Sequence, residues 1–149
     1  EVDDSIESLY GPSLAPEQTS LARCQASLGK AGYTYLTKTL KAQQKCRDSY
    51  TKGKALYHDS AKTMALSSST ACSREYKTAR KIAKAGTKAR KLVAGSRCSD
   101  ALLIQLDACS FSVDGLVSPD GTGGCLIDGH REGVTTMLRK QYCDDIVCP

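Results

Sequence analysis

The chain has 149 residues, which is enough for one compact domain and too few for two ordinary ones. Hydrophobic residues make up 40% and charged residues 25%, which excludes a disordered chain, while the absence of Trp and the single Phe exclude a thick aromatic core. The net charge is +5, and no apolar run approaches the roughly 20 residues of a membrane-spanning helix, so we expect none.

The first part of the chain predicts an acidic arm followed by one long helix. Residues 1–16 contain one Gly and two Pro and show no sustained period, so we expect an extended arm. A helix is predicted to begin at Pro16-Glu17, where an acidic residue suits the helix dipole, and to end near Gly53. Its inner stripe follows the 3.6-residue period and consists of Cys24, Leu28, Ala31, Tyr35, Thr39, Ala42 and Cys46.

The middle of the chain predicts a second long helix after a break. Scattered apolar residues in 55–66 are followed by a Ser and Thr run at 67–70, in which Thr70 is the predicted N-cap. Gly95 is the predicted stop. The expected inner stripe contains Cys72, Tyr76, Ala79, Ala83, Gly86 and Ala89, reinforced by Ile82, Leu92 and Val93.

Shorter helices are expected in the last third of the chain. One is predicted from Ser99 to Ala108, and another from Asp128 to Tyr142, with a Gly-, Pro- and Asp-rich loop at 112–124 between them. No alternating β pattern of useful length occurs. We therefore predict an all-α fold: an acidic arm (1–16), a basic antiparallel helical hairpin (17–98), and a C-terminal helical segment (99–149) in one domain with the hairpin. The residues expected to face inward on the last helix are Val134, Met137 and Leu138.

Four of the eight cysteines predict how the hairpin is crosslinked. Cys24 and Cys46 are 22 residues apart on one helix, about 33 Å along its axis, whereas a disulfide needs Cα atoms within about 7 Å. Cys72 and Cys98 are excluded as a pair for the same reason. The matched spacing predicts Cys46–Cys72 near the turn and Cys24–Cys98 at the open end.

The other four cysteines predict two smaller closures. Cys109 and Cys125 flank the Gly-rich loop and are expected to close it, and Cys143 and Cys148 are expected to form a small terminal loop. Eight cysteines allow many pairings, and free cytosolic thiols are the alternative. The chain has no Cys-x-x-Cys pair and only two histidines, which argues against zinc and haem sites, so we expect no cofactor.

Disulfides on this scale are typical of exported proteins. No charged-then-apolar leader precedes Glu1, so we expect the mature form of a secreted protein with its signal peptide already removed.

The charges are divided into three blocks along the chain. Residues 1–22 carry −5, residues 23–98 carry +15, and residues 99–149 carry −5. This layout predicts an anionic partner or head-to-tail association of copies, and a solvated lysine-rich helix face is an equally good interpretation. The expected basic surface consists of Lys77, Arg80, Lys81, Lys84, Lys88, Arg90 and Lys91.

Two stretches carry a family resemblance. The first is CQASLGKAGYTYLTKTLKAQQKCRDSYTKGK at Cys24–Lys54, and the second is CSDALLIQLDACSFSVDGL followed by GGCLIDGHR. They resemble uncharacterised secreted, cysteine-containing helical proteins of environmental bacteria, notably deltaproteobacteria and myxobacteria. The resemblance covers roughly residues 21–142 and implies a compartment and a helical fold, with no catalytic residues to transfer. The acidic arm and the CDDIVCP ending depart from that pattern, and since Cys143 and Cys148 arrive together in the ending, they most simply pair.

Residues that could support catalysis or ion binding are few. His130 lies beside Asp128 and Arg131, but no nucleophile elbow accompanies it, and a capping or packing role is the better interpretation. Asp114 and Asp120 suggest a cation loop only loosely, because the EF-hand spacing is absent. We therefore expect no enzyme. Tyrosines interleaved with lysines can indicate nucleic-acid binding, but at helical spacing they more often form a core: Tyr33, Tyr35, Tyr50, Tyr57 and Tyr76.

Two functions follow as hypotheses. The first is an exported structural protein whose acidic arm docks on the basic hairpin of the next copy, so that copies assemble into an extracellular filament or surface layer. The second is a secreted binding module for an anionic polymer, such as acidic polysaccharide, a cell surface or extracellular DNA. An enzyme or enzyme inhibitor built on the segment 114–131 remains a third, weaker hypothesis.

Overall fold

The computed structural model describes residues 19–95, 98–108, 112–117 and 123–142. These parts contain no strand beyond an isolated antiparallel bridge between Tyr57 and Ala65, so the all-α prediction is confirmed. The predicted arm 1–16 lies outside the described residues. The elements in chain order are α2 (Thr19–Thr51), the 3-10 helix η1 (Ser69–Arg74), α3 (Tyr76–Ala94), α4 (Asp100–Gln105), α5 (Val113–Leu116) and α6 (Cys125–Tyr142).

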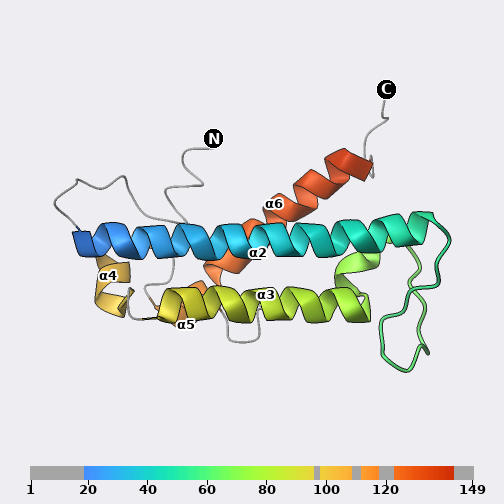
Figure 1. Cartoon of the computed structure of the whole chain (residues 1–149), viewed down its shortest axis with the longest axis horizontal. Helices are drawn as coiled ribbons and strands as arrows, with labels where there is room; N and C mark the ends of the chain where they lie inside the picture. The colour runs from blue at the N-terminus through green and yellow to red at the C-terminus, as the bar shows by residue number, and fades with distance from the viewer. Residues whose placement is uncertain (1–18, 96–97, 109–111, 118–122, 143–149) are drawn as a thin grey trace.

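Helices α2 and α3 form the predicted antiparallel hairpin (Figure 1). Helix α2 is 33 residues long, which corresponds to about 50 Å. All seven residues of the predicted α2 stripe are buried. On α3 the buried residues include Ala85, Gly86 and Ala89, whose small size leaves little side chain between the two helices. The hairpin seam is therefore narrow, and most of the larger apolar side chains lie elsewhere.

The predicted start of the second helix is wrong. Thr70 lies inside η1, and α3 begins only at Tyr76, with Glu75 as its N-cap. The backbone N–H of Thr78 donates to the Glu75 carboxylate at 2.6 Å, and Glu75 itself is in an extended conformation that interrupts the helix. Cys72, which is disulfide-bonded to Cys46 of α2, lies within the 3-10 turn that precedes α3.

The C-terminal helices agree with the prediction only in part. Helix α4 (Asp100–Gln105) lies within the predicted span 99–108 but ends before Ala108, and the Ser99 side chain caps it by accepting from the Leu102 N–H. A short helix, α5, lies inside the predicted loop 112–124, and α6 begins at Cys125 rather than at Asp128. Val134 and Leu138 are buried as expected, whereas Met137 is 47% exposed because α6 buries only one stripe of its surface.

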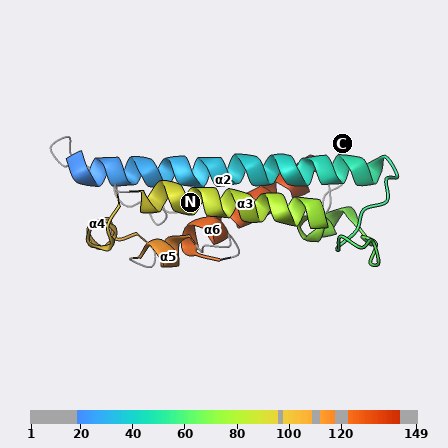
Figure 2. The same cartoon turned by 60° about the horizontal axis from the view of Figure 1, so that its bottom comes forward.

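The core is divided into two parts of unequal size. The larger lies at the open end of the hairpin, where α4, α5 and α6 pack beside it (Figure 2). It is built around Cys24 and Cys98 together with fully buried leucines from α2 and the C-terminal helices. The smaller surrounds Cys46 and Cys72 at the turn and contains Leu66 and Ala71.

Both predicted hairpin disulfides are present. Cys24–Cys98 has a Cα–Cα distance of 4.8 Å, and Cys46–Cys72 has one of 5.8 Å. Cys125 is also disulfide-bonded, while its expected partner Cys109 lies outside the described residues. The expected pair Cys143 and Cys148 falls outside them as well. The hairpin is thus fastened at both ends, which fixes the register of α3 against α2.

Candidate functional site

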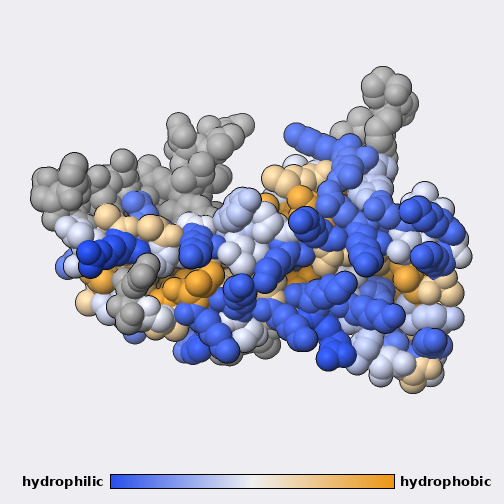
Figure 3. Space-filling model, in the orientation of Figure 1, coloured by the Kyte–Doolittle hydropathy of each residue, from blue (hydrophilic) through white to orange (hydrophobic). Residues whose placement is uncertain are grey.

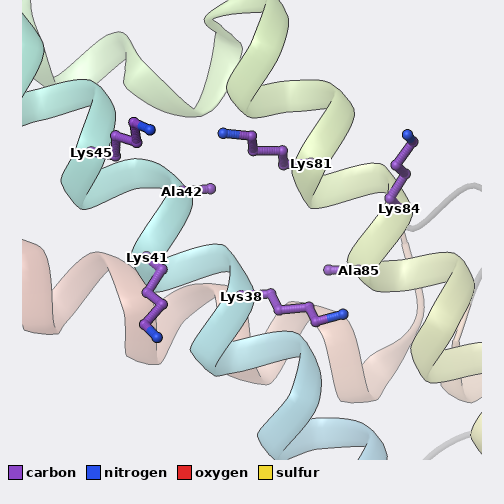
Figure 4. A pocket seen from close by; sticks show the side chains of 7 residues that line it. All are labelled: Lys38, Lys41, Ala42, Lys45, Lys81, Lys84 and Ala85. Atoms are coloured by element: carbon purple, nitrogen blue, oxygen red, sulfur yellow. The ribbon is translucent and has the colours of Figure 1, made fainter.

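A groove lined by lysines runs between α2 and α3. Its volume is about 370 Å³, and five lysines and two alanines line it (Figure 4): Lys38, Lys41, Ala42 and Lys45 from α2, and Lys81, Lys84 and Ala85 from α3. Figure 4 shows the Lys45 and Lys81 side chains reaching toward each other across the groove, while Lys38 extends toward α3. Hydrophilic side chains gather over this face of the hairpin in Figure 3. We call this feature the lysine groove.

The spacing of the lysines along each helix explains why they share one face. Lys38, Lys41 and Lys45 stand at i, i+3 and i+7, and on α3 the lysines 81, 84 and 88 repeat the same spacing. Residues at these intervals lie on one side of a helix. Because the helices are antiparallel and their register is fixed by two disulfides, five of these six lysines line the same groove, and Lys88 lies next to Lys38 at its border.

Among the residues that the structure describes, no carboxylate lines the groove. Helix α3 contains no acidic residue along its whole length, and the first acid on α2 is Asp48, after the last lysine of the triad. Like charges at i, i+4 destabilise a helix by a few tenths of a kcal/mol. Because these stretches of α2 and α3 contain no acidic residue, intrahelical Glu–Lys pairs do not relieve that repulsion.

The like charges on this face affect the pKa of one lysine. Lys38 lies against Lys88, and the charge of Lys88 is the main cause that lowers the pKa of Lys38 below its ordinary value of 10.5. A small desolvation and the close approach of the Lys88 side chain lower that pKa further. A bound anion would act in the opposite direction, because a nearby negative charge favours the ammonium form.

The predicted basic surface is only partly gathered at the groove. Lys81 and Lys84 line it, and Lys88 borders it through Lys38. Lys77 and Lys91 continue the same α3 stripe and are exposed, but they do not line the groove.

The two arginines of the predicted surface are engaged elsewhere. The Arg80 guanidinium lies 5.5 Å from the ring centre of Tyr76. Arg90 forms an ion pair of 2.8 Å with Asp114 on α5. These contacts hold both guanidinium groups against neighbouring side chains, so the lysines form the basic face.

Sequence reasoning missed the α2 side of the groove. Lys38, Lys41 and Lys45 carry the same i, i+3, i+7 signal as the α3 lysines, but they were not set apart from the rest of the basic block. Once the two hairpin disulfides are assumed, the register places the two triads opposite each other. The lysine spacing is therefore present in the sequence, but it identifies a shared site only once the disulfide pairing is known.

The other candidate residues do not form a site. Among the described residues, no three His, Cys, Asp or Glu side chains are arranged to hold a metal ion. Asp114, the residue suggested for a cation loop, is paired with Arg90, and Asp120 falls outside the described parts. His130 is half-buried, and burial lowers its pKa, while its neighbours Asp128 and Arg131 form an ion pair of 2.9 Å.

The tyrosines divide between core and surface. Tyr35 is fully buried, as expected for a core residue, whereas Tyr33 is 69% exposed, contrary to expectation. The three others are half-buried: Tyr50, Tyr57 and Tyr76. None of the five lines the lysine groove, so the aromatic side chains do not add a stacking surface to it.

Comparison with known proteins adds no analogue. No family model, curated protein or solved structure matches the chain. Within the described parts, no helix is long and apolar enough to cross a membrane. The lysine groove is therefore the feature on which a functional proposal has to rest.

Proposed function

We propose that this chain is an exported binding protein, rather than an enzyme, and that it holds a single chain of acidic polysaccharide along the lysine groove. The proposal rests on one observation: five lysines from two helices line one groove, with no carboxylate among the described lining residues. The disulfides support export, because such crosslinks persist in oxidising compartments.

The chemistry of the groove favours a polysaccharide over a nucleic acid. Proteins that bind single-stranded nucleic acids combine basic grooves with aromatic side chains on which bases stack. The described lining here consists of lysine and alanine, which offer positive charge and small apolar side chains but no aromatic ring on which a base could stack. Lysine ammonium groups act as mobile point charges, which suits carboxylate or sulfate groups spaced irregularly along a sugar chain.

Binding would release the counterions that accompany the polymer. With five lysines engaged, and by analogy with single-stranded polyanions, the logarithm of the affinity should fall with the logarithm of salt at a slope of about −3.5. This corresponds to about a hundredfold loss of affinity between 50 and 200 mM salt.

Heparin, a sulfated polysaccharide, is the probe for a direct test. A triple charge reversal in the groove, Lys38→Glu, Lys45→Glu and Lys81→Glu, should abolish retention on heparin at low salt. The matched control reverses three exposed lysines away from the groove: Lys52, Lys54 and Lys140. Both variants have the same net charge, so only a groove-specific site separates them.

Equal loss of heparin binding in the two triple variants would contradict the proposal, because net charge alone would then explain the retention. Failure of the wild-type protein to bind heparin at 50 mM salt would also contradict it. Tighter binding to single-stranded DNA than to heparin at equal salt would replace the polysaccharide by a nucleic acid.

Self-assembly is a second candidate, favoured by the charge layout. Residues 1–22 carry −5 and could serve as the anionic partner for the lysine groove of another copy. In that case the wild-type protein should form filaments or layers at low salt under the electron microscope, and deletion of residues 1–16 should prevent this. A protein that stays monomeric at high concentration and low salt excludes this candidate and leaves polysaccharide binding intact.

A further inference from the structure

A second cavity lies between α2, α3 and α6, separate from the lysine groove. Its volume is about 300 Å³, at the lower limit of pockets that hold small organic ligands. Tyr35, Thr39 and Gln43 of α2 form one wall, and Ile82 and Ala83 of α3 provide apolar contact. It shares no lining residue with the lysine groove.

Two hydroxyl groups of residues that line this cavity have no hydrogen-bond partner in the described parts of the chain. Tyr35 is 0% exposed and Thr39 is 1% exposed, and neither the Tyr35 Oη nor the Thr39 Oγ1 atom forms a hydrogen bond with any of the described residues. Burying a hydroxyl without a partner is costly, and most buried polar groups in native proteins are satisfied. A ligand or ordered water in the cavity would supply the missing partners.

Thr39 differs in this from other helical hydroxyls of the same chain. Ser27, Thr37 and Thr51 of α2 each donate to the carbonyl oxygen four residues earlier, at 2.9, 2.8 and 3.0 Å. Such back-bonding is the usual way for a helix to satisfy a Ser or Thr hydroxyl. The Thr39 hydroxyl does not make that bond, although Thr39 lines the cavity.

The cavity carries polar groups of two kinds at two depths. Tyr35, Thr39 and Gln43 stand on successive turns of α2, spanning about 12 Å, and all three are buried. Arg131 of α6 also lines the cavity, with a side chain 44% exposed and ion-paired to Asp128. Neutral hydroxyls therefore lie deep and a guanidinium lies near the solvent, with Ile82 and Ala83 along the wall.

We propose that this cavity binds a small hydroxylated organic acid. The ligand's hydroxyl hydrogen-bonds with Tyr35 Oη and Thr39 Oγ1, its apolar body packs on Ile82 and Ala83, and its carboxylate pairs with Arg131. A site built to hydrogen-bond a ligand hydroxyl discriminates against the analogue that lacks it, because the protein's own polar groups are then left unpaired.

Three related probes test each part of this assignment by calorimetry. The first is 3-(4-hydroxyphenyl)propanoate, the second is 3-phenylpropanoate, which lacks the hydroxyl, and the third is 4-ethylphenol, which lacks the carboxylate. The first should bind the wild-type protein about tenfold more tightly than either of the others, as expected for the loss of one hydrogen bond or one charge pair.

The variants then assign each preference to its residues. In the double variant Tyr35→Phe and Thr39→Val, the preference for the hydroxylated acid over 3-phenylpropanoate should disappear. In Arg131→Gln, the preference over 4-ethylphenol should disappear. Thr37→Val is the matched control on the same helix, since its hydroxyl bonds to its own backbone and lies outside the cavity lining, and it should keep both preferences.

The double variant should keep its fold, because it removes hydroxyls that have no protein partner; its thermal midpoint should equal or exceed that of the wild-type protein. If none of the three probes binds the wild-type protein at millimolar concentration, the cavity holds ordered water only and the proposal is wrong. It is equally wrong if the hydroxyl preference survives in a folded double variant.

Discussion

Lys38 of α2 and Lys88 of α3 meet across the hairpin, and the charge of Lys88 lowers the pKa of Lys38 below 10.5. Neither helix alone determines this contact. The buried stripe of α2 packs on the small residues Ala85 and Ala89, and the two disulfides fix the register, so the lysines on the adjoining face are brought together. The lysine groove therefore holds a repulsion that an anionic partner would relieve.

The first prediction concerns the pKa of Lys38. Removing the neighbouring charge by Lys88→Gln should raise the Lys38 pKa in the free protein, and a bound heparin oligosaccharide should raise it in the wild-type protein. Binding near pH 10 should consequently take up protons. NMR titration of the lysine Cε and Nζ signals measures both effects, and an unchanged Lys38 titration in Lys88→Gln would show that another group controls it.

The second prediction compares the two disulfides. Cys24–Cys98 spans 74 residues and Cys46–Cys72 spans 26, for which chain entropy gives about 4.5 and about 3.5 kcal/mol of stabilisation. Cys24 is also fully buried in the larger core, so its replacement leaves a cavity there.

Replacing Cys24 and Cys98 by Ala should therefore lower the free energy of unfolding more than replacing Cys46 and Cys72 by Ala, and it should loosen the open end of the hairpin. Urea denaturation measures the stability, and amide exchange locates the loosening. Replacing Cys143 and Cys148 by Ala should leave the hairpin intact. A larger loss from the Cys46 and Cys72 pair would contradict the order expected from loop length.

The hairpin could be predicted from the sequence because its determinants are periodic. The stripe from Cys24 to Cys46 repeats every 3.6 residues, and the geometry of a straight helix is enough to exclude pairing between its two ends. Together with the matched spacing of Cys72 and Cys98, this predicts an antiparallel hairpin with Cys46 paired to Cys72 near the turn and Cys24 paired to Cys98 at the open end.

The remaining features depend on contacts between distant segments. Helix α5 is only four residues long, and it is supported by the Arg90–Asp114 ion pair and by an Asp100 carboxylate that accepts from the Val113 N–H. Local sequence does not reveal such partners. The late start of α3 is set by the Glu75 cap, which follows the disulfide-bonded Cys72, and the second half of the lysine groove depends on the register that this disulfide fixes.

The third prediction concerns the alkaline stability of α6. Tyr142, in the last turn of α6, donates a hydrogen bond to the Asp48 carboxylate of α2, and its ring lies 5.2 Å from the Arg47 guanidinium. Burial, with the Asp48 hydrogen bond and charge, raises the pKa of Tyr142 to about 12. Since the folded pKa exceeds the ordinary value of 10, the contact stabilises fully below pH 10 and is lost as the pH rises through about 12.

Tyrosinate absorbance should therefore show one late titration near pH 12 that is missing in Tyr142→Phe. The helical circular dichroism of the wild-type protein should fall over the same range, and Tyr142→Phe should lower the free energy of unfolding at neutral pH by about 1 kcal/mol. Tyr33→Phe is the control, because Tyr33 is 69% exposed. A late titration that persists in Tyr142→Phe would assign it to a different tyrosine.

The last prediction compares the substitution of Gly by Ala at two positions, one just before the first residue of α6 and one inside that helix. Gly124 has a φ of +96°, and a Cβ there would lie 2.5 Å from the Leu116 carbonyl oxygen, so Gly124→Ala forces the backbone to shift. The Gly124 carbonyl also accepts from the Asp128 N–H at 2.9 Å, so the shift disturbs the first turn of α6. We expect a loss of about 2 kcal/mol in the free energy of unfolding.

Gly133, nine residues later inside α6, has nothing within 4 Å of the place where a Cβ would lie. Ala restricts the unfolded chain and favours the helix, so Gly133→Ala should raise the free energy of unfolding by about 0.5–1 kcal/mol. Urea denaturation of the two variants beside the wild-type protein provides the comparison. If both substitutions shift the stability in the same direction, the close approach of Gly124 to Leu116 does not control how α6 begins.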